Sequence, residues 1–115
     1  MSLERVLKTL ESLGLSRVES EVYIYLAKAG PSKAEQLAAG LRMTNRQVFP
    51  VLNGLKKKKI VVSSPERVRM LSAIAFEELL NLFMKLSAEK AKSIEETKQE
   101  LVDSWMELTK KKDKS

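Results

Sequence analysis

Apolar residues near the start of the chain recur at helical spacing in two short segments. Residues 3–13 place leucine and valine on one face of a helix that Gly14 would end. The next segment begins at Ser16, which forms a capping box with Glu19 three residues later. Its apolar face continues to Gly30. The pattern therefore predicts two short amphipathic helices.

Residues 31–59 predict a second pair of helices with a tight turn between them. Ser32 and Glu35 have the spacing of a capping box, and so do Thr44 and Gln47. Two helix starts therefore lie twelve residues apart. This spacing leaves room for only about two turns of the first helix.

The first helix of this pair is predicted to end at Gly40, with residues 41–43 as the turn. The second helix places one apolar stripe on its buried side, formed by Val48, Val51, Leu52 and Leu55. Its opposite face is mostly polar, and four lysines, residues 56–59, follow at its end.

Beyond the lysines the spacing changes from helical to alternating. Residues 60–62 are β-branched, residues 63–66 have turn composition, and residues 67–71 alternate polar with apolar side chains. These features predict a short hairpin in which Arg67 and Arg69 point to the same side.

From residue 73 to about residue 111 the chain has no glycine or proline, which predicts one long helix. Side chains at alternating steps of four and three form a coiled-coil seam about 42 Å long. We expect a second copy of the chain to cover the seam, although the helix could instead fold back along its own domain. The seam is interrupted by Ser87 and Lys98, and its apolar members are Leu80, Met84, Ala91, Ile94, Leu101, Trp105 and Leu108.

Taken in order, these elements predict a mainly α fold with a small β-hairpin. It is a winged helix-turn-helix in residues 1–75, followed in residues 76–115 by a long C-terminal dimerisation helix. The last residues, 110–115, are expected to form a frayed tail.

Composition narrows the possible functions. The chain of 115 residues has no cysteine and no histidine, so common nucleophiles, bases and metal ligands are missing, and we expect no enzyme activity and no cofactor or metal. No apolar run approaches the roughly 18 residues needed to cross a membrane. The expected location is the cytoplasm, in association with the nucleoid. The net charge of +6 lies entirely in residues 1–60, which predicts a polyanion-binding surface.

The run from residue 13 to residue 62 closely resembles the DNA-binding domain of the TrmB-like archaeal transcription regulators, with the similarity covering about residues 10–75. The matching motifs are Leu-Gly-Leu-Ser at 13–16, Glu-Ser-Glu-Val-Tyr at 19–23, Gly-Pro at 30–31 and Val-Phe-Pro-Val-Leu at 48–52. The resemblance implies a winged helix that binds double-stranded DNA. Many longer members carry a sugar-sensing domain after the long helix; this sequence ends before one could begin, so we expect no small-molecule effector.

Three residues depart from the family pattern. Phe49 replaces the usual tyrosine, and Lys59 stands where glycine is common before the wing. Pro50 lies inside the second helix of the pair, where it removes the hydrogen bond to the Arg46 carbonyl and predicts a kink.

The predicted function is that of a sequence-specific transcription regulator that binds DNA as a homodimer, with the helix from Thr44 in the major groove. The start of this helix would read base edges, and other residues, including the wing arginines, would contact phosphates. Residues 57–59 either contact DNA or form a solvated helix end. The full predicted DNA-binding set is Ser32, Lys33, Arg42, Thr44, Asn45, Arg46, Gln47, Phe49, Asn53, Lys56, Lys57, Arg67 and Arg69. The alternative is a winged helix that binds a protein partner through Phe49 and the wing.

Overall fold

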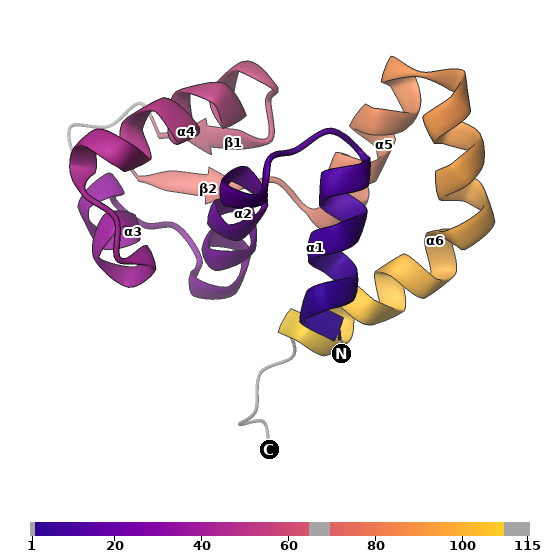
Figure 1. Ribbon diagram of the computed structural model, residues 1–115, viewed down its shortest axis with the longest axis horizontal. Coiled ribbons are helices and arrows are strands. Elements are labelled where there is room, and N and C mark those ends of the chain that lie inside the picture. Colours follow the sequence, from indigo (N-terminus) through magenta and orange to yellow (C-terminus); the bar gives the residue numbers. More distant parts are fainter. Residues whose placement is uncertain (1, 65–69, 110–115) are drawn as a thin grey trace. The chain divides into compact units, whose positions relative to one another are not determined.

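The computed structural model of the chain describes residues 2–64 and 70–109 (Figure 1). These residues divide into two compact units: one spans Leu15–Ile74, and the other combines Met1–Gly14 with Ala75–Ser115. The sequence placed a division after residue 75, and the structure changes unit between Ile74 and Ala75. The prediction placed the N-terminal helix with the winged helix, however, whereas the structure groups it with the C-terminal helices.

The unit Leu15–Ile74, here called the winged-helix unit, contains three helices and a two-stranded antiparallel sheet (Figure 1). Its elements are α2 (Arg17–Ala29), α3 (Ala34–Leu41), α4 (Asn45–Lys57), β1 (Val61–Ser63) and β2 (Leu71–Ala73). The order of helices and hairpin confirms the predicted winged helix-turn-helix.

α2 lies at the centre of the winged-helix unit and contacts α3, α4 and β2. Tyr23, which is fully buried on α2, donates a hydrogen bond of 2.7 Å from its hydroxyl to the carbonyl of Ile74 at the end of the hairpin. The core that fixes α4 is formed by Leu15, Val22, Tyr23, Ile24, Leu26, Leu37, Ala38, Val48, Leu52, Leu55, Ile60, Val61 and Leu71.

The hairpin differs in position from the prediction. Its second strand lies at Leu71–Ala73, later than the predicted 67–71, and Ser63 pairs with Leu71 at the end of the ladder. Of the predicted strand, residues 67–69 lie outside the described residues, Met70 is not part of a strand, and Leu71 begins β2. Arg67 and Arg69 lie outside the described residues.

An isolated β-bridge connects the residue before Lys33 to the hairpin. Ser32 and Leu71 form a β-bridge, with N–H···O distances of 3.0 Å and 2.7 Å in the two directions. This bridge ties the start of α3 to the wing sheet.

The other unit, here called the helical unit, contains α1 (Ser2–Ser12), α5 (Phe76–Leu86) and α6 (Ala88–Thr109). α6 packs against both α1 and α5, and Figure 1 shows its C-terminal end beside the start of α1. The core residues are Val6, Leu7, Leu10, Leu13, Phe76, Leu79, Leu80, Phe83, Ile94 and Leu101.

The prediction of one uninterrupted helix over residues 73–111 is wrong. Ser87 has extended backbone angles (φ −158°, ψ 131°) and separates α5 from α6. The carbonyl of Ser87 accepts the first helical hydrogen bond of α6 from Ala91 N–H at 2.9 Å. The chain therefore reverses at Ser87 so that α5 and α6 can pack on each other.

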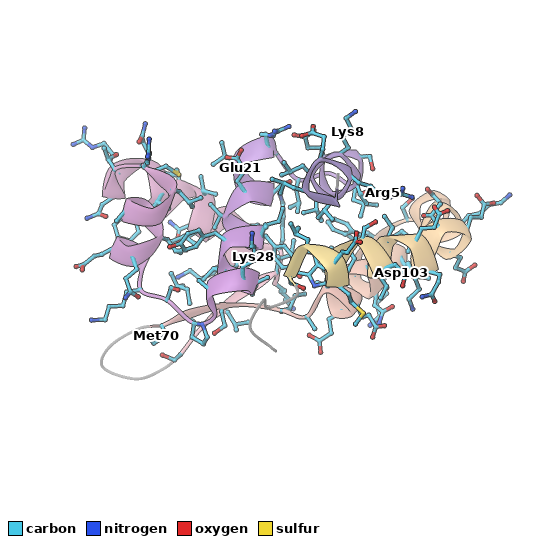
Figure 2. The ribbon with its side chains drawn as sticks, turned by 90° about the horizontal axis from the view of Figure 1, so that it is seen from below. Arg5, Lys8, Glu21, Lys28, Met70 and Asp103 are labelled. Atoms are coloured by element: carbon cyan, nitrogen blue, oxygen red, sulfur yellow. The ribbon has the colours of Figure 1, made fainter. Side chains whose placement is uncertain are left out.

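Two further contacts hold α6 inside the helical unit. The rings of Phe76 and Trp105 stack with centroids 4.5 Å apart and planes 5° from parallel. Arg5 on α1 donates a hydrogen bond of 2.7 Å to the carboxylate of Glu100 on α6; Figure 2 labels Arg5 on the first of these helices and Asp103 on the second.

The fold changes the interpretation of the predicted seam. Leu80, Ile94 and Leu101 are buried within the helical unit itself, so they are not available to a second chain. Their burial agrees with the alternative prediction from the sequence, in which the helix folds back on its own domain. Partly accessible seam residues remain, namely Met84, Ala91, Trp105 and Leu108.

Candidate nucleic-acid interface

The positive charge of the protein is concentrated in the winged-helix unit. Residues 15–74 contain eleven lysine and arginine residues against four glutamates, a net charge of +7, while the rest of the chain has ten against eleven acidic residues, a net charge of −1. The candidate interface therefore belongs to the unit that contains α3, α4 and the hairpin.

The start of α3 differs from the predicted capping box. Lys33 is the N-cap, and its backbone N–H donates a hydrogen bond of 2.8 Å to the side-chain oxygen of Gln36. Ser32 is buried and its hydroxyl donates to the carbonyl of Gly30 at 2.9 Å. The Ser32 cap is therefore wrong, because this residue is held in the β-bridge to Leu71. Its buried hydroxyl also removes it from the set of phosphate contacts, while Lys33 remains exposed.

The turn between α3 and α4 is set by Arg42 rather than by glycine. α3 continues to Leu41, one residue beyond the predicted end, and Arg42 adopts the left-handed conformation (φ 59°, ψ 44°). The N–H of Met43 donates to the carbonyl of Ala38 at 2.8 Å, the long hydrogen bond of a Schellman motif. Arg42 is exposed at the outer side of this turn.

Gly40 has a different role from the one predicted. A Cβ atom at this position would overlap the ring of Tyr25 on α2. Gly40 therefore allows α2 and α3 to approach closely, which is a second reason for glycine in a helix besides left-handed angles.

The capping box that begins α4 is confirmed. The Thr44 hydroxyl accepts from Gln47 N–H at 3.1 Å, and the Gln47 side-chain oxygen accepts from Thr44 N–H at 2.9 Å. This use of the Gln47 oxygen leaves only its amide group for a partner. Asn45 and Arg46 are exposed beside it.

Opposite faces of α4 have opposite character. Val48, Leu52 and Leu55 are buried against the core, whereas the other face is exposed. That face presents Asn45, Arg46, Phe49, Pro50, Asn53 and Lys57, with Lys56 half-buried at its edge. Phe49 is 51% exposed and is an apolar group in an otherwise mainly polar face.

Pro50 lies inside α4, which is helical from Asn45 to Lys57. The helix therefore continues on both sides of the proline. The predicted kink stays a prediction.

The end of α4 is also a Schellman motif. Lys59 takes a left-handed φ of 65°, and the N–H of Ile60 donates to the carbonyl of Leu55 at 3.0 Å. A lysine thus occupies a backbone conformation that favours glycine, the residue common at this position in the family that the sequence resembles.

Lys58 is held by Glu19 of α2. Its ammonium group lies 2.9 Å and 3.1 Å from the two carboxylate oxygens. Burial acts to raise the pKa of the Glu19 carboxyl, but the hydrogen bonds from Lys58 and from the backbone of Ser16 outweigh it and hold the pKa below its ordinary value. Glu19 is therefore charged at neutral pH. Its partner Lys58 is one of the lysines for which DNA contact was one of two predicted roles.

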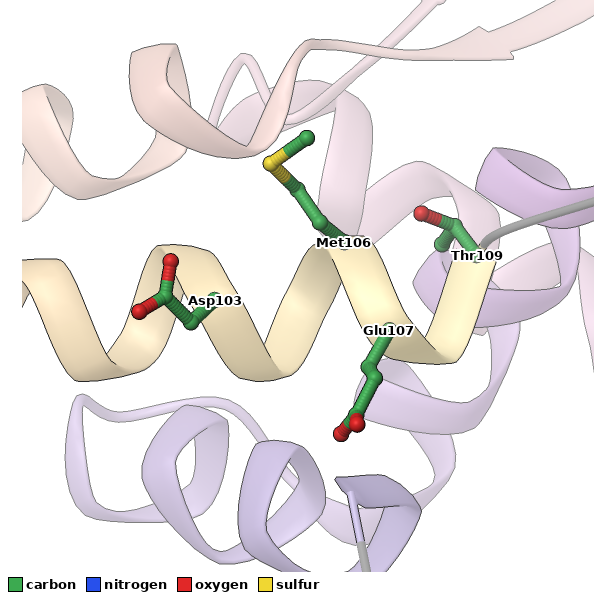
Figure 3. A pocket seen from close by; sticks show the side chains of 4 residues that line it. All are labelled: Asp103, Met106, Glu107 and Thr109. Carbon is green, nitrogen blue, oxygen red and sulfur yellow. The ribbon is translucent and has the colours of Figure 1, made fainter.

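A hollow on the surface of α6 has no convergent set of polar groups. It measures about 560 Å³, and the described residues that line it, Asp103, Met106, Glu107 and Thr109, all lie on α6 (Figure 3). One helix supplies all of these side chains, so they do not converge from several elements as the groups of a ligand site usually do.

Two other site classes find no candidate in the part of the chain that the structure describes. It contains no cluster of three or more acidic residues arranged to hold a metal ion. Among the same residues, no helix has the length and apolar character needed to cross a membrane.

Comparison with known proteins identifies the family. The family model described as the sugar-specific transcriptional regulator TrmB matches residues 10–77, which include all of α2, α3, α4 and the hairpin. The chain belongs to the TrmB family. This confirms the resemblance found in the sequence, and TrmB members are transcription regulators rather than enzymes.

One TrmB relative is the HTH-type sugar sensing transcriptional regulator TrmBL1 of Pyrococcus furiosus. It is 34% identical over 58 residues, which make up 50% of this chain and 17% of the relative. The chain thus spans about a sixth of the length of that protein.

A solved structure supports the fold independently. A MarR-like transcriptional regulator from Thermotoga maritima superposes with a TM-score of 0.54 at 22% identity, covering 82% of this chain and 79% of the other. This similarity confirms the winged-helix fold.

Three features of the interface were not predicted. The Ser32–Leu71 bridge and the Gly40–Tyr25 approach involve residues far apart in the sequence, and no local pattern indicates them. The Glu19–Lys58 pair also joins distant positions, and Glu19 was explained by its capping role alone. Both of its roles are present in the structure.

Proposed function

We propose that this TrmB-family protein is a sequence-specific regulator that binds double-stranded DNA as a homodimer, in association with the nucleoid. The observation that carries the proposal is the exposed face of α4. It begins at a capped helix N-terminus, displays Asn45 and Arg46, and belongs to the unit with a net charge of +7. A helix of this kind has the dimensions and chemistry of a major-groove reader.

Base recognition is assigned to the exposed face of α4 between Asn45 and Asn53. Arg46 suits guanine, whose N7 and O6 accept two hydrogen bonds, and Asn45 and Asn53 suit adenine. Gln47 contributes less, because its side-chain oxygen is used in the cap. Phe49, half-exposed in the middle of this face, suits the methyl group of thymine.

Phosphate contacts are assigned to exposed or half-buried cations of α3, the turn and α4. Lys33 at the start of α3 and Arg42 in the turn both precede α4 in the chain. Lys56 and Lys57 lie in the last turn of α4. The wing arginines, Arg67 and Arg69, complete the proposed set, although they lie outside the described residues. These contacts set register and affinity rather than sequence preference.

The proposed dimer uses the accessible surface of α5 and α6. Leu86 and Met106 are 72% and 62% exposed, and Trp105 and Leu108 are partly accessible nearby in the sequence. A two-fold arrangement of two winged helices would recognise an inverted repeat with half-sites about 34 Å apart, or one turn of DNA. No described residue is assigned to a small-molecule effector in this proposal.

The direct test of base recognition is selection of binding sites from a random duplex pool, followed by anisotropy measurements with the Arg46→Ala variant. We expect the wild-type chain to select an inverted repeat. Arg46→Ala should weaken binding to it by about 1–3 kcal/mol and relax the preference at one position of each half-site.

The matched control is Lys8→Ala, because Lys8 is an exposed cation on α1, in the helical unit (Figure 2). It should leave affinity and preference unchanged. If selection yields no preferred sequence, or if Arg46→Ala behaves like the control, the proposed base reader is wrong.

A second candidate function is protein docking through the same face. Phe49 is 51% exposed and Val62 on β1 is 52% exposed, so two large apolar side chains are available in the winged-helix unit. Salt separates the two functions: DNA binding weakens steeply as salt rises, whereas an apolar protein contact does not. Replacement of thymine by uracil in the selected site also separates the two functions. Uracil lacks the methyl group, so this change weakens binding only if Phe49 contacts thymine.

A further inference from the structure

The four lysines at the end of α4 are not equivalent. The ammonium group of Lys58 is bonded to both oxygens of Glu19, at 2.9 Å and 3.1 Å. Its side chain is 43% exposed, but that of Glu19 is only 14% exposed. The acceptor of this pair is therefore a largely shielded carboxylate, which interacts with a cation more strongly than an exposed one does.

The position of the Glu19 carboxylate is fixed from three sides. Its Oε1 accepts a hydrogen bond of 3.0 Å from the backbone N–H of Ser16, and Lys58 approaches from α4. On the third side lies Gly54, where a Cβ atom would come within 3.1 Å of Oε2. Glycine on this face of α4 leaves room for the carboxylate between the two helices.

We propose that Glu19 is a positioning residue that keeps Lys58 off DNA and ties the last turn of α4 to the start of α2. Lys58 is then not one of the cations that meet phosphate, and the phosphate contacts proposed for Lys56 and Lys57 are unaffected. This inference rests on the proposed DNA-binding function and assigns roles within that same site.

The physical consequence concerns the salt dependence of binding. Each lysine or arginine that neutralises a phosphate adds about 0.9 to the slope of log K against log salt, because counterions are released. Lys58 is neutralised by the Glu19 carboxylate and contacts no phosphate, so it adds nothing to this slope. Release of Lys58 would add one phosphate contact.

The test measures this slope for the full chain on one duplex by anisotropy. Glu19→Gln keeps the capping box, since glutamine is accepted at this position, but removes the negative charge. We expect its slope to be steeper by about 0.9. Lys58→Met should leave the wild-type slope unchanged, and Lys58→Met added to Glu19→Gln should restore it.

The matched control is Lys57→Met, one residue earlier and exposed in the last turn of the same helix. It should make the slope shallower by about 0.9. The proposal is overturned if Lys58→Met reduces the wild-type slope as much as Lys57→Met does, or if Glu19→Gln leaves the slope unchanged. A role of Glu19 in folding alone would not produce a change that Lys58→Met reverses.

A second measurement separates this inference from the proposed function. The melting temperatures of the wild type, the two single variants and the double variant Glu19→Gln/Lys58→Met form a double-mutant cycle that needs no DNA. We expect the melting temperature of the double variant to be no lower than that of the less stable single variant. If the decreases in melting temperature of the two single variants instead add up in the double variant, the proposed contact between the helices is wrong. Absence of DNA binding by the wild type would instead contradict the proposed function while this cycle still decides the pair.

Discussion

Lys59 occupies a left-handed backbone conformation, with φ of 65°, at the junction between α4 and β1. Such angles cost a residue with a Cβ atom about 1–2 kcal/mol, and glycine avoids that cost. Glycine also gains freedom in the unfolded chain, which offsets part of the benefit. We expect Lys59→Gly to raise the free energy of unfolding by up to about 1 kcal/mol.

Urea denaturation, monitored by circular dichroism, measures this change in the free energy of unfolding. The matched control is Lys57→Gly, because Lys57 has helical angles inside α4 and glycine there should lower stability by about 1 kcal/mol. Equal destabilisation by both variants would contradict the role given to the positive φ at Lys59.

The Glu19 carboxyl gives stability a dependence on pH. Its pKa is held below the ordinary value of 4.5 in the folded chain. The folded state therefore binds its proton more weakly than the unfolded state does, so the contribution is fully present above about pH 4.5 and is lost as pH falls through the lowered pKa.

Thermal denaturation of the wild type and of Glu19→Gln between pH 7 and pH 3 checks this sign. The wild type should melt higher at pH 7, and the difference should shrink as the solution becomes acidic. A difference that grows on acidification would mean that the pKa of Glu19 is raised rather than lowered.

At the residue level, short-range rules predicted the helix caps that depend on neighbours three positions apart. The Ser16–Glu19 and Thr44–Gln47 boxes form as expected. Ser32 fitted the same rule, but its backbone pairs with Leu71 in a β-bridge and its buried hydroxyl donates to the carbonyl of Gly30. Local spacing contains no information on such a distant partner.

Pro50 is an unusual member of α4 because it has no backbone N–H to bond the carbonyl of Arg46. The helix nevertheless extends from Asn45 to Lys57, and Pro50 is exposed. We expect Pro50→Ala to stabilise the chain by about 1–3 kcal/mol, because it restores this hydrogen bond and removes the ring from the preceding turn.

Denaturation by urea gives the stability change, and anisotropy on the selected duplex gives the effect on binding. Asn53→Ala, on the same exposed face, serves as a control for the gain expected from alanine propensity alone, which is less than about 1 kcal/mol. If Pro50→Ala gains no more than this control, the proline imposes no strain on α4.

At the level of elements, hydrophobic spacing, cap signals and the absence of glycine and proline together placed the described helices, but α5 and α6 were predicted as one helix because the break at Ser87 was missed. A helical pattern continues across this position because residues on α5 and α6 face the same core. Serine is a frequent N-cap, so Ser87 itself was the available local signal. Periodicity reports which side of a helix is buried, and it does not report whether the covering surface belongs to the same chain.

The proposed homodimer is a property of the whole molecule and has a test suited to this fold. A charge at Leu101 would disturb the core of the helical unit, so exposed Met106 is the better position. Met106→Glu should leave the circular dichroism spectrum unchanged and convert dimer to monomer in sedimentation at micromolar concentration.

Val18→Glu places the same charge at an exposed apolar residue of α2, in the winged-helix unit, and should remain dimeric. A wild type that sediments as a monomer, or a Met106→Glu variant that stays dimeric, would contradict the surface assigned to dimerisation.

The distribution of charge was predictable from the sequence because it is a property of composition along the chain. The excess of +7 in residues 15–74 was already evident as a basic first half. The partition of the lysine run was not predictable, because it depends on how α2 brings Glu19 to the end of α4. The same holds for α1, whose apolar stripe indicated burial but not its partner, α6.

Binding of duplex DNA by α4 of the winged-helix unit can be measured with the full chain in solution. An anisotropy titration of the full chain compares the selected inverted repeat with a scrambled duplex of equal length at several salt concentrations. We expect tighter binding to the inverted repeat and a linear fall of log K with log salt, with a slope of several units because several cations meet phosphate. Binding that is undetectable at low salt, or that is insensitive to salt, would contradict the proposed function.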